Sequence, residues 1–241
     1  MSLHHLGRPD EALHGWRELA GEVGIIGIGV LIALGSQQFV ETAQEKHEAK
    51  EAEEVIRGEI AANIGRVQLR IQTRPCVDRR ISEMQTILNS AIVQPNIVTP
   101  NWIGRPIYST FLRNRWDAES QAGRVALINP ESLSGYAVMY AQMRDLENEM
   151  MAEQTDWAKL RTLEHLQRLD QPASFELNVT LQDARYRTWR ITLLATRLFE
   201  LAKKLEFANF NSYPASPAVC LPITTTREAA NRASVFRFGE P

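Results

Sequence analysis

A strongly apolar run without a charged side chain lies near the N-terminus, from Val23 to Val40. A helix of this length, rising ~1.5 Å per residue, extends about 27 Å, which is close to the ~30 Å hydrocarbon core of a bilayer. No charge falls on any face of that helix, whereas a surface helix of a soluble domain keeps one polar face. The run therefore predicts one membrane-spanning helix, which we place at residues 21–40.

Three other structures compete for this run: a buried helix of a soluble domain, a cleavable signal peptide and an amphipathic helix on a membrane surface. Ala33 to Gly35 resembles the small-x-small site of a signal peptide, but Arg8 and Arg17 are offset by acidic residues, so no basic n-region precedes the run. An amphipathic surface helix needs a charged face, which is missing. The spanning helix is favoured over all three.

Small residues recur inside the run at four-residue spacing, as Ala20 with Gly24 and Gly29 with Ala33. Such pairs allow a second helix to approach the backbone closely. They predict helix packing in the bilayer, either with other membrane protein subunits or as a homo-oligomer. The simpler interpretation is that glycine is common in membrane helices.

The chain contains two cysteines, Cys76 and Cys220, and both follow the apolar run. Disulfides persist in oxidising compartments, so one bridge between them would place the bulk of the chain in a bacterial periplasm. The alternative is two unrelated buried thiols in a cytosolic domain. We expect the disulfide, with residues 1–20 in the cytoplasm, although Lys46, Lys50 and Arg57 after the run tilt the charge bias the other way.

The rest of the chain predicts an all-α fold. Apolar residues at helical spacing indicate a stalk over residues 41–72, which continues from the membrane helix. Pro75 is expected to break it, and residues 73–207 to form an antiparallel helical bundle in one periplasmic domain. Its later helices are expected from Asn129-Pro130 to about Leu169 and over residues 175–207. Residues 208–241 are expected to be an extended tail that Cys220 ties to the bundle.

A proline-rich segment, residues 95–116, concentrates aromatic and arginine side chains. These residue types are enriched where proteins meet partners. The predicted partner-binding residues are Trp102, Arg105, Tyr108, Phe111, Arg113 and Trp116. The alternative is a long loop that folds over the core and buries its aromatic side chains.

Arg66, Arg70 and Arg74 lie four residues apart on one helical face. Guanidinium groups in such a row are suited to bind an anion. The alternative is a solvated basic stripe that pairs with nearby acids.

Several functional classes are disfavoured. A net charge of −2 and the missing helix-turn-helix, RNP and zinc-finger spacings argue against nucleic acid. No zinc-binding His-Glu-x-x-His, nucleophile elbow or phosphate-binding glycine loop occurs, so we expect no metal, no cofactor and no catalytic residue. The carboxylates of Glu147, Glu149, Glu153 and Glu164 are interpreted as the solvated face of a long helix.

Residues 14–38, together with the Pro75 to Arg80 segment, resemble a group of uncharacterised proteobacterial single-pass inner-membrane proteins. The resemblance covers the N-terminal third and is weak from residue 95 onward. It implies an inner-membrane anchor followed by a periplasmic helical domain, with Cys76 as a structural residue. It implies no activity.

These observations lead to two hypotheses of different class. The first is a non-catalytic accessory or scaffolding subunit that docks on a larger inner-membrane assembly through its small-residue membrane face and residues 95–116. The second is a periplasmic module that senses or binds a small anion near Arg66, Arg70 and Arg74 and acts through a partner.

Overall fold

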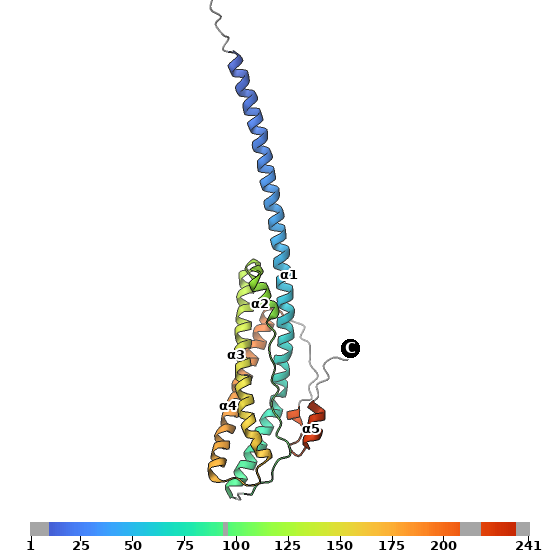
Figure 1. Cartoon of the computed structure of the whole chain (residues 1–241), viewed down its shortest axis with the longest axis vertical. Helices are drawn as coiled ribbons and strands as arrows, with labels where there is room; N and C mark the ends of the chain where they lie inside the picture. The colour runs from blue at the N-terminus through green and yellow to red at the C-terminus, as the bar shows by residue number, and fades with distance from the viewer. Residues whose placement is uncertain (1–9, 94–95, 208–217, 235–241) are drawn as a thin grey trace, which may run out of the picture. The chain divides into compact units, whose positions relative to one another are not determined.

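The computed structural model describes residues 10–93, 96–207 and 218–234, and the chain divides between Glu51 and Ala52 into two units (Figure 1). All regular structure in the described residues is helical, apart from one isolated bridge between Asn96 and Arg168. The predicted all-helical chain with a long apolar helix near its N-terminus is confirmed. The division falls inside the predicted stalk, at neither of its ends.

The first unit is the N-terminal part of α1 (Asp10–Val93). Its apolar side chains are exposed on every side, from Leu19 to Val40. The most apolar window of this helix has a mean hydropathy of 2.0, and none of it is buried by the rest of the chain. In length and composition, this helix is suited to cross a membrane.

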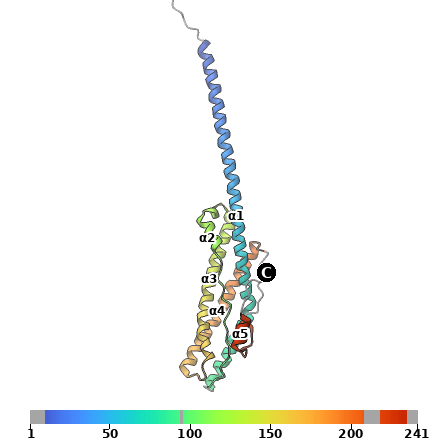
Figure 2. The ribbon, with the colours of Figure 1, turned by 45° about the vertical axis from the view of Figure 1, so that its right-hand side comes forward.

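The second unit contains the rest of α1 and four further helices, α2 (Asn114–Gln121), α3 (Pro130–Leu160), α4 (Gln171–Lys204) and α5 (Arg227–Ser234). Figures 1 and 2 show α3 and α4 side by side along the second part of α1. One apolar cluster joins Ile60 of α1, Met143 of α3 and Leu198 of α4. A second cluster contains Ile81, Trp157 and Leu181, one from each of the same helices.

The predicted helix break at Pro75 is wrong, because α1 continues through this proline to Val93. A helical proline removes one N–H donor and crowds the carbonyl four residues earlier, which commonly bends a helix. The ribbon of α1 does change direction in the second unit (Figure 1). Burial of Val77, Ile81 and Met84 just after Pro75 offsets the lost hydrogen bond.

The predicted antiparallel order of the bundle also needs correction, because α3 runs parallel to α1. Glu59 contacts Tyr140, and about three turns later along both helices Arg70 contacts Glu153. Residues 96–113 carry no helix and return along the bundle, which brings the start of α3 back beside the early part of this unit's α1. An extended chain of this length reaches up to about 60 Å. Of the two long helices α3 and α4, α4 runs antiparallel to α1.

The starts of the two later helices follow their capping residues. The Asn129 side chain accepts a hydrogen bond from the Glu131 amide, and Pro130 occupies the first position of α3, as predicted. The Asp170 side chain caps α4 in the same way at Ala173, so α4 begins four residues before its expected start. The expected extension of α3 to Leu169 is wrong: α3 ends at Leu160 and a short 3-10 helix, Arg161–Glu164, follows.

The predicted extended tail is partly helical. A short 3-10 helix, Ala218–Cys220, and α5 form where only an extended segment was expected. Residues 208–217 and 235–241 of that prediction lie outside the described residues. Cys220 bonds to Cys76 of α1, with their Cα atoms 4.7 Å apart, so the cysteines form the pair that the sequence predicted.

Removing this bridge should destabilise the second unit. A cross-link between residues separated by 144 positions restricts the unfolded chain by roughly 4–5 kcal/mol on the chain-entropy model. We expect reductant to lower the urea midpoint of the wild type markedly. The Cys76→Ser/Cys220→Ser variant should start at the lower midpoint and not respond to reductant. Equal midpoints for the wild type with and without reductant would contradict a stabilising bridge.

Candidate functional site

Two polar side chains of α1 hold the segment that precedes α2. The Asn63 side chain both donates to the Leu112 carbonyl, at 2.8 Å, and accepts from the Leu112 amide, at 2.9 Å. The Glu59 carboxylate accepts from the amides of Arg115 and Trp116 in the first turn of α2. A carboxylate at this place satisfies free helix N–H groups and favours the positive end of the helix dipole. Residues 112–116 are therefore fixed on α1.

The predicted partner-binding residues separate into two groups. Trp102 and Phe111 are buried, 9% and 8% exposed, and belong to the chain's own interior. Partner binding through these two side chains is a wrong prediction, and burial over the core was the correct alternative for them. The sequence could not distinguish the two outcomes, because an aromatic side chain in a loop fits a core as well as a partner. Arg105, Tyr108 and Arg113 are exposed, and Trp116 is half-buried.

A surface pocket of about 290 Å³ lies between α2 and α3. Its lining includes Trp116 and Tyr140, whose ring centroids are 4.9 Å apart. Burial, together with the neighbouring Glu59 carboxylate, raises the pKa of Tyr140, so this phenol stays neutral. The full lining is Arg113, Trp116, Asp117, Ala137, Tyr140, Ala141 and Arg144.

The charges around this pocket fit an acidic group. Arg113 and Arg144 are exposed and line the pocket together with one carboxylate, Asp117. Two guanidinium groups beside aromatic rings are suited to a carboxylate carried by a partner protein. Only Arg113 and Trp116 of this pocket were predicted, since Arg144 comes from a helix distant in sequence.

The predicted arginine stripe does not form an anion site. Arg66 donates to the Asn63 side chain and to the Thr110 carbonyl, and Arg74 pairs with Asp78 of the same helix. Arg70 is buried and bonds to Glu153 of α3 at 2.5 Å. Each guanidinium is thus used inside the chain. Arg74 fits the alternative of a solvated arginine that pairs with an acid, whereas Arg70 pairs with an acid but is buried.

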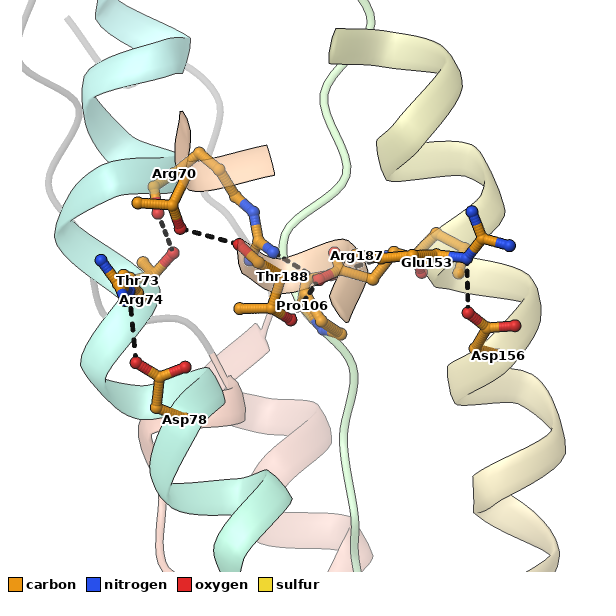
Figure 3. Close-up of polar contacts among 11 residues, drawn as sticks. Arg70, Thr73, Arg74, Asp78, Pro106, Glu153, Asp156, Arg187 and Thr188 are labelled. Atoms are coloured by element: carbon orange, nitrogen blue, oxygen red, sulfur yellow. Dashed lines mark hydrogen bonds and ion pairs between the residues drawn. The ribbon is translucent and has the colours of Figure 1, made fainter. Parts of the chain in front are cut away.

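Arg70 and Glu153 form a buried polar centre with Thr188 of α4. Figure 3 shows the three side chains meeting between α1, α3 and α4. The Thr188 hydroxyl donates to the Glu153 carboxylate at 2.9 Å. Burial raises the pKa of Glu153, and the Arg70 and Thr188 contacts oppose this shift. The interpretation of Glu153 as a solvated residue is wrong.

A second row of ion pairs joins α3 and α4 at the bundle surface. The Arg187 guanidinium bonds to Asp156 at 2.7 Å, and Arg190 bonds to Glu149 at 2.9 Å. Together with the Arg70 pair, these contacts fix which turn of α4 lies beside which turn of α3. The arginine side chains of these pairs are partly exposed, so solvent screening makes each pair weak alone.

A third polar cluster surrounds the disulfide. Arg80, fully buried, donates to the carbonyls of Trp102, Ile103 and Leu221 and pairs with Glu83 at 2.7 Å. Burial lowers the pKa of Arg80, and the Glu83 contact opposes this. Next to it, Arg79 donates to the Cys220 carbonyl at 2.6 Å. One turn of α1 therefore holds both the loop at residues 102–103 and the C-terminal segment.

Glu164 closes this cluster from the opposite side. Its side chain is buried, contrary to the expectation of a solvated carboxylate. It accepts from the Ile103 amide at 3.0 Å and pairs with Arg161 and Arg227. Burial acts to raise the pKa of Glu164, but the amide and the two guanidinium groups outweigh it, so the pKa lies below its ordinary value of 4.5.

Glu164 should make the stability of the second unit depend on acid. A carboxyl with a lowered pKa in the folded state stabilises the fold above its unfolded pKa, and this contribution is lost as the pH falls below about 4.5 through the folded value. We expect Glu164→Gln to reduce the free energy of unfolding at pH 7 and to approach the wild type near pH 3. Urea titrations across this range measure the difference.

The matched control is Glu131→Gln, which changes an exposed carboxylate at the start of α3. The free energy of unfolding of this variant should stay close to that of the wild type at each pH. A Glu164→Gln deficit that stays constant from pH 7 to pH 3 would contradict the proposed role of its charge.

Within the described residues, no group of three His, Cys, Asp or Glu side chains is placed to hold a metal ion. The three clusters hold the chain's own segments, and the pocket between α2 and α3 presents the exposed guanidinium groups of Arg113 and Arg144. Comparisons of the chain with protein-family models, with curated proteins and with solved structures give no match.

Proposed function

We propose that the chain is a non-catalytic accessory or scaffolding subunit of a larger bacterial inner-membrane assembly. In this proposal α1 crosses the membrane once within residues 21–40, residues 1–20 lie in the cytoplasm, and the second unit lies in the periplasm. The observation that carries the proposal is the ring of exposed apolar side chains from Leu19 to Val40. Lipid is the surrounding in which such a ring is stable.

The disulfide supports the periplasmic placement. Bridges of this kind persist where thiols are kept oxidised, as in the bacterial periplasm, and are rare in the cytosol. Cys76 and Cys220 both belong to the second unit, so the bridge supports a location of that unit on the oxidising side. We give this more weight than the small excess of lysine and arginine after the apolar run.

Two surfaces are available to partners in this proposal. The first is the small-residue face of the membrane helix, where a Cβ atom added at Gly24 or Gly29 would meet nothing within 4 Å. A neighbouring membrane helix fits this face. The second is the pocket of Arg113, Trp116 and Arg144, which suits an acidic side chain of a partner. The anion-sensing alternative is not carried forward, because its three arginines bond within the chain.

Charges introduced into the membrane segment should release the chain from the membrane. An arginine near the centre of a spanning helix costs about 2.5–3.5 kcal/mol. We expect Ile28→Arg/Leu31→Arg to move from the carbonate-resistant membrane pellet to the soluble fraction. The control, Thr42→Arg/Gln44→Arg, alters exposed residues of α1 beyond the apolar run and should stay in the pellet. Equal pelleting of both variants would contradict a spanning helix.

A labelling experiment in the same cells shows in which compartment the second unit lies. In intact spheroplasts, a membrane-impermeant maleimide should label Cys76 and Cys220 only after an impermeant reductant is added. Labelling that requires permeabilisation and no reductant would place the second unit in the cytoplasm and overturn this part of the proposal.

Reversing the pocket charges should remove the partner. We expect a protein to co-purify with the wild-type chain after mild detergent extraction, and its amount to fall strongly for Arg113→Glu/Arg144→Glu. Lys159→Glu/Lys204→Glu makes the same change in net charge at exposed sites outside the pocket and should retain the partner. A wild-type chain that migrates as a lone monomer on sizing would count against the accessory function.

A further inference from the structure

Helix α4 carries apolar side chains on two opposite faces. One face packs into the core, with Leu181, Ala184, Ile191 and Leu198 buried. The other face points outward and displays Phe175, Val179, Tyr186 and Trp189, which are 72%, 46%, 54% and 53% exposed. A helix at the surface of a bundle ordinarily keeps this outer face polar. The second face therefore indicates a surface that is covered in the assembled protein.

The outer residues follow the spacing of a coiled-coil seam. Starting from Phe175, they occur at alternating steps of four and three residues through Val179, Gln182, Tyr186, Trp189 and Leu193. Steps of four and three are the heptad pattern by which one helix packs against another. The polar member, Gln182, donates to the Gln85 side chain of α1. The rings of Tyr186 and Trp189 lie 5.7 Å apart at the middle of the seam.

Charged residues follow one edge of this seam at seven-residue intervals: Glu176, Asp183, Arg190 and Arg197. The two acids come first and the two bases second. Glu176 and Arg197 are equally distant in sequence from the point between Tyr186 and Arg187, and so are Asp183 and Arg190. A second α4 that runs in the opposite direction therefore faces each acid with a base. A parallel α4 would instead bring Arg185 towards Arg190 of the other copy, which is repulsive.

We infer that the outer face of α4 pairs with the same face of a second copy of this chain, in antiparallel orientation. Such a two-fold interface is self-complementary, because each half supplies both members of every contact. Glu176 faces Arg197 of the other copy, and Tyr186 faces Trp189. Arg190 keeps its bond to Glu149 of its own α3. Its guanidinium is partly exposed, so it can also meet Asp183 of the other copy.

This pairing differs from helix packing in the membrane and does not rest on it. Arg57 contacts the Leu205 carbonyl at one end of the bundle, and Gln85 contacts Asn178 at the other, so α1 and α4 are antiparallel. In an antiparallel α4 pair, the Ala52 ends of the two α1 segments consequently lie at opposite ends.

The first test measures self-association of the full chain in detergent, where both orientations are open. Sedimentation should show a concentration-dependent dimer. Truncation of a central aromatic residue commonly weakens an interface about thirtyfold or more, so we expect this loss for Trp189→Ala. Met151→Ala, which truncates an exposed apolar residue on α3, is the matched control and should not change the dimer. Circular dichroism checks that both variants keep their helix content.

The second test addresses direction by charge exchange. Glu176→Arg alone and Arg197→Glu alone should each dimerise weakly, and an equal mixture of the two should recover a heterodimer in which the reversed charges meet. Asp145→Arg, at an exposed site on α3, is the control and should behave like the wild type. Glu176→Cys mixed with Arg197→Cys should cross-link, whereas Glu176→Cys with itself should not.

Three outcomes would overturn the inference. The first is a wild-type chain that is monomeric at all concentrations. The second is a mixture of Glu176→Arg with Arg197→Glu that forms no heterodimer. The third is a dimer that is lost in Gly24→Ile/Gly29→Ile but unaffected by Trp189→Ala. The last result would assign self-association to the membrane helix and leave the proposed anchoring intact.

Discussion

The second unit depends on buried side chains of α1 that bond to the backbone of segments without helix. Buried amides and carbonyls need partners, and residues 96–113 have no strand or helix to supply them. Asn63 meets this need at Leu112, and Arg80 meets it at Trp102, Ile103 and Leu221. These contacts require one continuous helix, because Asn63 and Arg80 lie on either side of Pro75. The uninterrupted α1 is therefore the frame on which the returning segment and the C-terminal segment are placed.

The polar centre of Arg70, Glu153 and Thr188 has a different physical role. Burying two charges costs more than most ion pairs return, so this centre is weak support for stability. Removing one partner, however, leaves the other charge buried and uncompensated. A shift of α4 by one turn relative to α3 would separate Thr188 from Glu153 and Arg187 from Asp156 together. Our hypothesis is that these contacts select the alignment of the helices, which the apolar clusters alone leave less defined.

Local sequence signals predicted the parts of the fold that local physics controls. The capping asparagine and proline at residues 129–130 marked the start of α3, and the apolar run marked the exposed helix. Features decided by distant contacts were missed. Pro75 stays in a helix because tertiary burial on its C-terminal side outweighs one lost hydrogen bond. Glu153 and Glu164 are buried because guanidinium groups from other elements meet them, and Arg144 reaches the pocket beside Arg113 only through the parallel packing of α3.

The chain exposes apolar residues in two different patterns, and each pattern implies a different surrounding. From Leu19 to Val40 the exposed apolar residues occupy the whole circumference of the helix, so no single protein surface of ordinary shape would cover them, whereas lipid would. On α4 the exposed apolar residues form one narrow seam with charges along its edge, and lipid would leave those charges unpaired. A helix with the complementary seam satisfies both the apolar side chains and the charges. The width of the apolar surface, more than its hydropathy, therefore distinguishes the segment that we propose to cross the membrane from the seam on α4.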